Sequence, residues 1–236
     1  MKISGKKFFI TGSGRRLGRA ILEGLLAQNA QIIAHCHSSR KELEELKREN
    51  SQILKIYSAD FSNFQEVVSL ANRLQVFNDL EGIILNSAVF FPDGKLDEFE
   101  SRFETLISIN LKAPLYLAKQ LGQRMKSQKG GIIILLADIY GKKPLRGHSI
   151  YSITKAGVLM AVRSLALELA PEVRVNSISP GYILEPVKGK GPSLSRIPLQ
   201  KKGDPQNIVE TVKFLISNDY ITGIDIPVDG GKRIQD

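Results

Sequence analysis

Tyr151 and Lys155 are the two residues whose types and spacing point most directly to chemistry. They are four residues apart in a segment with helical spacing of apolar residues, so both side chains share one face of the predicted helix. A lysine ammonium beside a phenol stabilises the phenolate and is expected to lower the tyrosine pKa. Such a tyrosine can donate a proton to a substrate near neutral pH. Tyr-x-x-x-Lys is common by chance, and its position after the fifth predicted strand makes it specific.

A glycine-rich turn follows the first predicted strand, with the sequence Thr11-Gly12-Ser13-Gly14-Arg15-Arg16-Leu17-Gly18. Glycines allow the backbone to approach a pyrophosphate at the start of the next helix, where free N–H groups carry partial positive charge. A plain tight turn would also use these glycines. The position in the first strand–helix unit favours dinucleotide binding.

The end of the second predicted strand lacks the acidic residue that binds the ribose of NAD. No Asp or Glu occurs in residues 31–41, which instead contain His35, His37, Ser38, Ser39 and Arg40. Arg15 and Arg16 lie in the facing turn, and arginine matches the geometry of phosphate oxygens. This pattern favours NADPH as the cofactor; a basic solvated loop is the alternative.

Asp60 and the pair His35 and His37 have competing interpretations. Asp60 follows the third predicted strand and could accept a hydrogen bond from an adenine amino group or cap the following helix. The two histidines share one face of a strand, but no further ligand is near them in the sequence. We therefore expect no metal site.

These residues need a scaffold of alternating strands and helices. Apolar patterns predict strands at 7–11, 31–37, 53–57, 82–85, 132–136, 173–178 and 224–228, and helices at 17–26, 40–50, 64–77, twice within 96–129, at 149–169 and at 205–216. The predicted fold is α/β, a Rossmann-type doubly wound parallel sheet of about seven strands with helices on both faces. We expect one domain, 1–236, with a substrate lid at 182–204 because that stretch is long and rich in Gly, Pro, Ser and Lys.

Composition narrows the class of protein. The single cysteine excludes an intramolecular disulfide and a multi-cysteine metal site. The longest apolar run, 132–137, is too short to span a membrane and residues 1–7 are too polar for a signal core, so we expect a cytoplasmic protein without membrane contact. The net charge is +9, and residues 1–19 alone contain six Lys or Arg and no acid. Because Arg15 and Arg16 belong to this excess, an anionic dinucleotide, and a folate-like carboxylate tail, explain it better than nucleic acid.

The chain resembles the short-chain dehydrogenase/reductase family over essentially its full length. The matching features are residues 11–18, Asp60, Asn86-Ser87-Ala88, Asn110, Tyr151 with Lys155, Asn176, Pro180-Gly181 and Val228-Asp229-Gly230-Gly231. The resemblance implies hydride transfer from a nicotinamide, with Tyr151 as proton donor, Lys155 as ribose contact and pKa modulator, and Asn110 holding a water of the proton relay. It also implies a homotetramer with interface helices around 96–129 and 149–169. The cofactor contacts expected are Gly12, Arg15, Arg16, Leu17, Gly18, His35, His37, Ser38, Ser39, Asp60, Phe61, Asn86, Ser87, Ala88, Tyr151, Lys155, Pro180 and Gly181.

Three departures from the family pattern narrow the resemblance. Arg16 stands where Gly or Ala is usual, Asp138 takes the position of the catalytic serine, and Val89 ends a segment that usually reads Asn-Asn-Ala-Gly. The first two departures, with the His-x-His-x-Ser of 35–39, are similar to trypanosomatid-type pteridine reductases and bacterial dihydromonapterin/dihydrofolate reductases.

The chemistry of Asp138 agrees with a pterin substrate. An ionised aspartate cannot donate a hydrogen bond to a ketone oxygen as serine does, whereas it can orient Tyr151 or relay a proton to a ring nitrogen. A helix cap or a salt-bridged loop residue is the alternative. The expected substrate contacts are Arg16, Phe90, Phe91, Asp138, Tyr151 and Tyr182. One of Phe90 and Phe91 would stack on the heterocycle, unless both are core aromatics.

Together these observations predict an NADPH-dependent pteridine reductase that converts a dihydropterin, of the dihydrobiopterin, dihydromonapterin or dihydrofolate type, to its tetrahydro form. A carbonyl or 3-oxoacyl-carrier-protein reductase of the same family is the first alternative. A non-enzymatic, basic nucleotide-binding module is the second, and it would leave Tyr151, Lys155 and Asn110 without a use.

Overall fold

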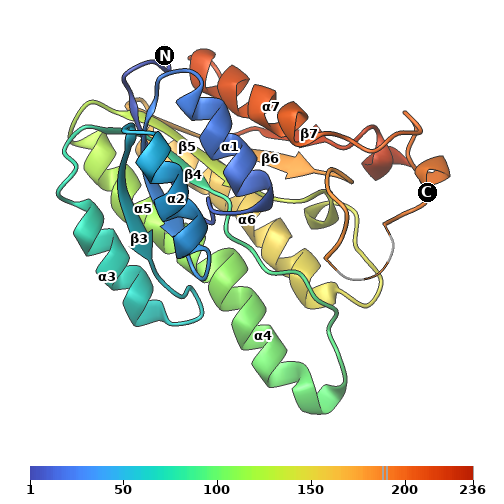
Figure 1. Ribbon diagram of the computed structural model, residues 1–236. Helices are drawn as coiled ribbons and strands as arrows, with labels where there is room; N and C mark the ends of the chain where they lie inside the picture. The colour runs from blue at the N-terminus through green and yellow to red at the C-terminus, as the bar shows by residue number, and fades with distance from the viewer. Residues whose placement is uncertain (188, 190, 236) are drawn as a thin grey trace.

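The computed structural model of the protein describes residues 1–187, 189 and 191–235. Within these residues seven strands form one sheet in the order β3-β2-β1-β4-β5-β6-β7, and the neighbouring strands run parallel. The strands are β1 (Lys7–Ile10), β2 (Gln31–Cys36), β3 (Ile53–Ser58), β4 (Leu80–Leu85), β5 (Gly131–Leu136), β6 (Val173–Pro180) and β7 (Asp225–Val228). The predicted doubly wound parallel fold is confirmed (Figure 1).

Helices cover both faces of the sheet (Figure 1). On one face lie α1 (Arg16–Leu26), α2 (Arg40–Glu49) and α7 (Pro205–Ser217); on the other lie α3 (Phe64–Leu74), α5 (Ala113–Lys126) and α6 (Ser149–Leu169). The shorter α4 (Phe99–Ile107) packs against α6. Alternate residues of each strand point to opposite faces of the sheet. Phe8 therefore packs in the core beneath α1, α2 and α7, and Phe9 packs in the core beneath α3, α5 and α6.

The chain reverses its direction of travel across the sheet next to β1. The chain crosses from β1 outward to β2 and β3 and then returns to β4, so β1 pairs with both β2 and β4. At such a switch point the loops leaving the two strands diverge and open a crevice beyond the carboxyl ends. This crevice is where the predicted site residues should gather.

Two further features concern single elements. Among the described residues, α6 is the one helix long and apolar enough to cross a membrane, and 56% of its most apolar window is buried inside the protein. A short π-helix, Ser108–Lys112, joins α4 to α5 and carries Asn110.

The segment between β6 and α7, which the sequence predicts to be a lid, runs beside the C-terminal residues (Figure 1). The Leu199 N–H donates to the Gly230 carbonyl at 3.1 Å, and the Gln235 amide donates to the Ser195 carbonyl at 3.3 Å. The segment ends at Asp204, whose side chain caps α7. Lys188 and Lys190 of the predicted lid lie outside the described residues.

Candidate active site

A cavity of about 490 Å³ opens beyond the carboxyl ends of the central strands. Most of the predicted site residues line it, namely Gly12, Arg15, Arg16, Leu17, Gly18, His35, His37, Ser38, Ser39, Asp60, Phe61, Asn86, Ser87, Ala88, Asp138, Tyr151, Lys155, Pro180 and Gly181. Sequence reasoning missed the apolar lining residues Ala59, Val89, Ile109, Leu136, Ala137, Ile183 and Leu184, and also Cys36. Cys36, Ala59, Leu136 and Ala137 lie at or just after the ends of predicted strands, which is the signal that could have identified these four.

The glycine-rich turn packs too closely for side chains. A Cβ on Gly18 would lie 2.0 Å from the Gly12 carbonyl oxygen, and one on Gly14 would lie 2.0 Å from the Ser39 Oγ. Thr11 ties the turn to the end of β4, because its hydroxyl accepts from the N–H groups of Asn86 at 2.9 Å and Ser87 at 3.1 Å. The turn is therefore held rigidly against the neighbouring strand end.

The start of α1 is free to receive an anion. Within the described residues no side chain caps this helix, and its first turn contains no acidic residue. The N-terminal N–H groups and the helix dipole are thus available at the cavity wall. These features, with the close-packed glycines, fit the pyrophosphate of a dinucleotide.

Arg15 and Arg16 take different directions from the turn. Arg15 is exposed and pairs with Glu42 of α2 at 2.5 Å. Arg16 has a positive φ of 55°, and its guanidinium donates to the Glu185 carbonyl at 2.8 Å. Arg16 therefore bridges the glycine-rich turn and the segment after β6.

His35 lines the cavity, but its ring is buried and both of its nitrogens bond to the protein. Its Nδ1 accepts from the Gly12 N–H at 3.3 Å, and its Nε2 donates to the Ala59 carbonyl at 3.1 Å. Its ring stacks on Phe61 with centroids 4.4 Å apart. The neutral ring ties the glycine turn to the ends of β2 and β3, so it shapes the wall of the site.

Burial makes His35 a source of pH-dependent stability. Burial lowers its pKa from 6.5 to about 4, so the folded protein binds its proton less tightly than the unfolded chain does. We therefore expect the free energy of unfolding to fall by about 3 kcal/mol from this residue as the pH drops from about 7 to about 4. Urea unfolding of His35→Gln, which keeps one donor and one acceptor, should show a weaker pH dependence over this range. Identical pH slopes for the variant and the parent protein would contradict the assignment.

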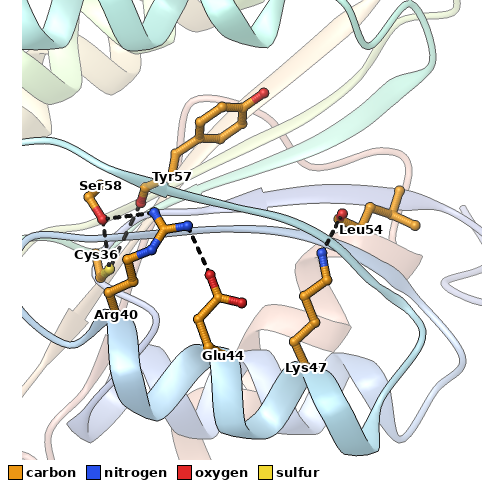
Figure 2. Close-up of polar contacts among 7 residues, drawn as sticks. All are labelled: Cys36, Arg40, Glu44, Lys47, Leu54, Tyr57 and Ser58. Carbon is orange, nitrogen blue, oxygen red and sulfur yellow. Dashed lines mark hydrogen bonds and ion pairs between the residues drawn. The ribbon is translucent and has the colours of Figure 1, made fainter.

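Arg40 is the basic residue that the structure places away from the cavity wall. Figure 2 shows it at the start of α2, where its guanidinium donates to Ser58 Oγ at 3.4 Å and to Glu44 at 2.8 Å. Lys47, further along α2, donates to the Leu54 carbonyl at 2.9 Å (Figure 2). The contacts with Ser58 and Leu54 dock α2 onto β3.

Asp60 caps a turn at the cavity edge. Its Oδ1 accepts from the Ser62 N–H at 2.8 Å, whereas the side chain that caps α3 is that of Asn63. The other carboxylate oxygen of Asp60 lies 3.7 Å from His37 Nε2. The predicted alternative, a cap on the following helix, is therefore wrong, and no metal-binding cluster of His, Cys, Asp or Glu occurs in the described part of the chain.

Asp138 and Tyr151 form the polar centre of the cavity. The Tyr151 hydroxyl donates to Asp138 Oδ2 at 2.8 Å, while Asp138 Oδ1 accepts from the Tyr140 N–H at 2.9 Å. Burial raises the pKa of Asp138, against the opposing influence of its hydrogen bonds and of nearby lysines. Asp138 therefore fulfils two of the roles expected for it, because it caps the short turn at Tyr140 and also orients the Tyr151 hydroxyl.

The pKa of Tyr151 shifts in the direction opposite to the expected one. Burial and the Asp138 carboxylate raise the pKa of Tyr151 well above its ordinary value. The Lys155 ammonium lies 5.6 Å from the ring centroid and donates to the Leu136 carbonyl at 3.0 Å. Burial lowers the pKa of Lys155 to about 8. The net shift of the Tyr151 pKa is therefore upward, opposite in direction to the lowering expected from Lys155, and the hydroxyl is protonated.

The two candidate phenylalanines lie in different surroundings. Phe90 is 55% exposed; its ring meets Tyr151 edge-on with centroids 4.8 Å apart and stacks on His148 at 4.7 Å. Phe91 packs into a small core cluster, with the Arg102 guanidinium 5.5 Å from its ring centroid. Neither phenylalanine is among the residues that line the cavity, and Phe90 is the one that contacts Tyr151.

Asn110 and Tyr182 do not line the cavity. Asn110 is buried, and its amide exchanges two hydrogen bonds with the Val89 backbone, at 2.8 and 2.9 Å, which fixes one lining residue. Tyr182 lines a second cavity between the predicted lid, β7 and α7, and its hydroxyl donates to Glu185 at 2.5 Å. The expected substrate contact of Tyr182 is not formed in this arrangement.

Comparison with known proteins gives consistent matches along the chain. A family model described as enoyl-(acyl carrier protein) reductase matches residues 12–233. The chain is 32% identical to nodulation protein G of Rhizobium sp. (strain N33) over 98% of both proteins. It is 32% identical to the NADP-dependent mannitol dehydrogenase of Hypocrea jecorina, over 97% of this chain and 92% of the relative. It is 29% identical to the 3-oxoacyl-(acyl-carrier-protein) reductase of Thermotoga maritima, over 98% of this chain and 99% of the relative.

Proposed function

The chain belongs to the short-chain dehydrogenase/reductase family of oxidoreductases, and within that family we propose that it is an NADPH-dependent reductase of a dihydropterin. The substrate would be of the dihydrobiopterin, dihydromonapterin or dihydrofolate type, reduced at a C=N bond. One observation carries this proposal: the carboxyl group of Asp138 accepts a hydrogen bond from the Tyr151 hydroxyl at a position where the family pattern has a serine hydroxyl.

The cofactor supplies a hydride from its reduced nicotinamide when it is bound. The protein would hold it with the α1 N-terminus, with Arg15 and Ser39 on the adenosine side, and with Lys155 on the nicotinamide side. Each of these residues lines the cavity.

Proton transfer falls to the Asp138–Tyr151 pair. Tyr151 is protonated at neutral pH, so its hydroxyl can donate to a ring nitrogen that becomes basic during reduction. Asp138 is a carboxylate in the resting site and fixes the direction of the hydroxyl. Because its pKa is raised, it can take up a proton transiently and pass it to the tyrosine after donation. Phe90 offers an aromatic face beside Tyr151 for a flat heterocycle.

A carbonyl or 3-oxoacyl reductase is the second candidate, and the names of the relatives favour it over a pterin reductase. A mannitol dehydrogenase and a 3-oxoacyl-(acyl-carrier-protein) reductase both match nearly the whole chain. A protonated tyrosine can also donate to a ketone oxygen. Against this candidate, Asp138 as a carboxylate offers no donor to a carbonyl. A substrate panel with NADPH separates the two candidates.

For the cofactor we expect NADPH to bind about 10–100-fold more tightly than NADH, because each charge-assisted hydrogen bond to a phosphate contributes about 1.5–3 kcal/mol. The strand end offers Ser38 and Ser39 and no acid, and Arg15 can turn from Glu42 toward a phosphate. Fluorescence titration measures both dissociation constants. Arg15→Gln should weaken NADPH binding and leave NADH binding unchanged, and Arg48→Gln, an exposed arginine on α2, is the matched control. Equal affinities for NADPH and NADH in the parent protein would refute the preference.

A further inference from the structure

The segment after β7 returns to the catalytic centre and is held in one conformation. Asp229 accepts from the N–H groups of Gly231 at 3.0 Å and Arg233 at 2.8 Å. Gly230 and Gly231 have positive φ values of 62° and 87°, which a residue with a Cβ rarely adopts. The short turn Lys232–Ile234 that follows is therefore fixed relative to β7.

Lys232 projects from this turn onto Tyr140. Its ammonium donates to the Tyr140 hydroxyl at 3.0 Å and lies 5.3 Å from the ring centroid. Across residues 1–187, 189 and 191–235, no carboxylate comes within 4.0 Å of this ammonium. The two acids of the same region have other partners, since Asp225 pairs with Lys142 at 2.8 Å and Asp229 with its own turn.

Tyr140 contacts both groups, since its hydroxyl accepts from Lys232 and its backbone binds the Asp138 carboxyl. Its backbone N–H donates to Asp138 Oδ1 at 2.9 Å, two residues along the chain. Burial raises the pKa of the Asp138 carboxyl, and the charge on Lys232 opposes this effect, more weakly than the Tyr140 hydrogen bond and Lys155 do. A C-terminal residue thereby influences the residue that the sequence places at the serine position.

The groups that face Asp138 come from three elements. Tyr151 and Lys155 face it from α6, Tyr140 from the turn after β5, and Lys232 from the C-terminal turn. Lys155 is completely buried, and burial lowers its pKa to about 8, so its positive charge is already partly lost in weakly alkaline solution. Lys232 is half-buried and is the second cation acting on the carboxyl.

We propose that Lys232 is a positioning residue, which acts through Tyr140 to keep the Asp138 carboxyl ionised and hydrogen-bonded to the Tyr151 hydroxyl. This role goes beyond the proposed function: it concerns the proton donor, and it holds for a pterin or a ketone substrate. It rests on the reductase chemistry of the family and not on the choice of substrate.

The direct test is a carbon NMR titration of the Asp138 carboxyl in the cofactor-free protein, with Asp138→Asn used to assign the signal. In Lys232→Met the apparent pKa of Asp138 should rise above the parent value, because an opposite charge nearby favours the ionised form. Lys232→Arg should restore the parent value. Lys143→Met, a lysine of the neighbouring loop, is the control and should leave the titration unchanged. An unmoved Asp138 titration in Lys232→Met would overturn the proposal.

A kinetic measurement supplies the second readout. For whichever substrate is turned over, the acidic limb of log kcat/KM against pH should move to higher pH in Lys232→Met, while NADPH affinity stays at the parent value. A lower kcat with an unchanged pH profile would indicate a merely structural role and contradict the proposal. The NMR titration needs no turnover, so it tests the role of Lys232 even if no pterin is reduced. Failure of the pterin proposal is seen in the substrate panel, whereas failure of this inference is seen in the Asp138 titration.

Discussion

Tyr151→Phe is expected to reduce kcat by about 10²–10⁴-fold, which is the contribution of a positioned general acid. The variant keeps the ring that packs beside Phe90 and removes only the hydroxyl that donates to Asp138. The glycine turn and the α1 N-terminus are untouched, so NADPH should bind with the parent affinity. Stopped-flow turnover and fluorescence titration measure these two quantities separately.

A matched control for this variant is Tyr116→Phe on α5. Tyr116 packs edge-on against Phe64 with ring centroids 5.1 Å apart, and it is not among the residues that line the cavity. It should keep full turnover. If Tyr151→Phe also keeps full turnover, Tyr151 is not the proton donor.

Asp138→Ser is expected to reduce pterin turnover by about 10²-fold and to leave reduction of an activated ketone unchanged or increased. Serine can still cap the turn at Tyr140, but it removes the carboxylate that raises the pKa of Tyr151. The pKa of Tyr151 should therefore fall. A hydroxyl in this position can also donate to a carbonyl oxygen, as in the usual family pattern.

Asp138→Asn separates charge from shape in the same experiment. Asparagine keeps the volume and one acceptor, yet it can neither ionise nor relay a proton. We expect it to lose pterin turnover to the same extent as Asp138→Ser, without the gain in ketone reduction. Full pterin turnover in either variant would show that the Asp138 carboxyl is not required.

Much of the fold could be read from local patterns, because buried parallel strands are continuous apolar runs. Gln31–Cys36 and Ser149–Leu169 form as the periodicity predicts, to within a residue. The helix predicted over 64–77 ends at Leu74, since Gln75 closes it with a bond to Asn72. The π-helix at Ser108–Lys112 has no local signal, because it depends on packing between α4, α5 and α6.

The site was predictable wherever a residue lies at the end of a strand and less so wherever two distant segments meet. Strand order brings Asn86 to the glycine turn, and both belong to motifs. The burial of the His35 side chain was not predictable, because it depends on how β2 aligns with β3 in the sheet. The contact between Lys232 and Tyr140 was not predictable, because the two residues are 92 positions apart in the sequence. The turn that precedes Lys232 also looks purely structural in the sequence.

The substrate itself tests the central proposal most directly. NADPH oxidation by the parent protein should be measured with dihydrobiopterin, dihydromonapterin and dihydrofolate, alongside a 3-oxoacyl thioester. We expect turnover with at least one of the pterins at a kcat/KM above that for the thioester. Reduction of the thioester, with no NADPH oxidation in the presence of any pterin, would contradict the proposal and establish the carbonyl reductase in its place.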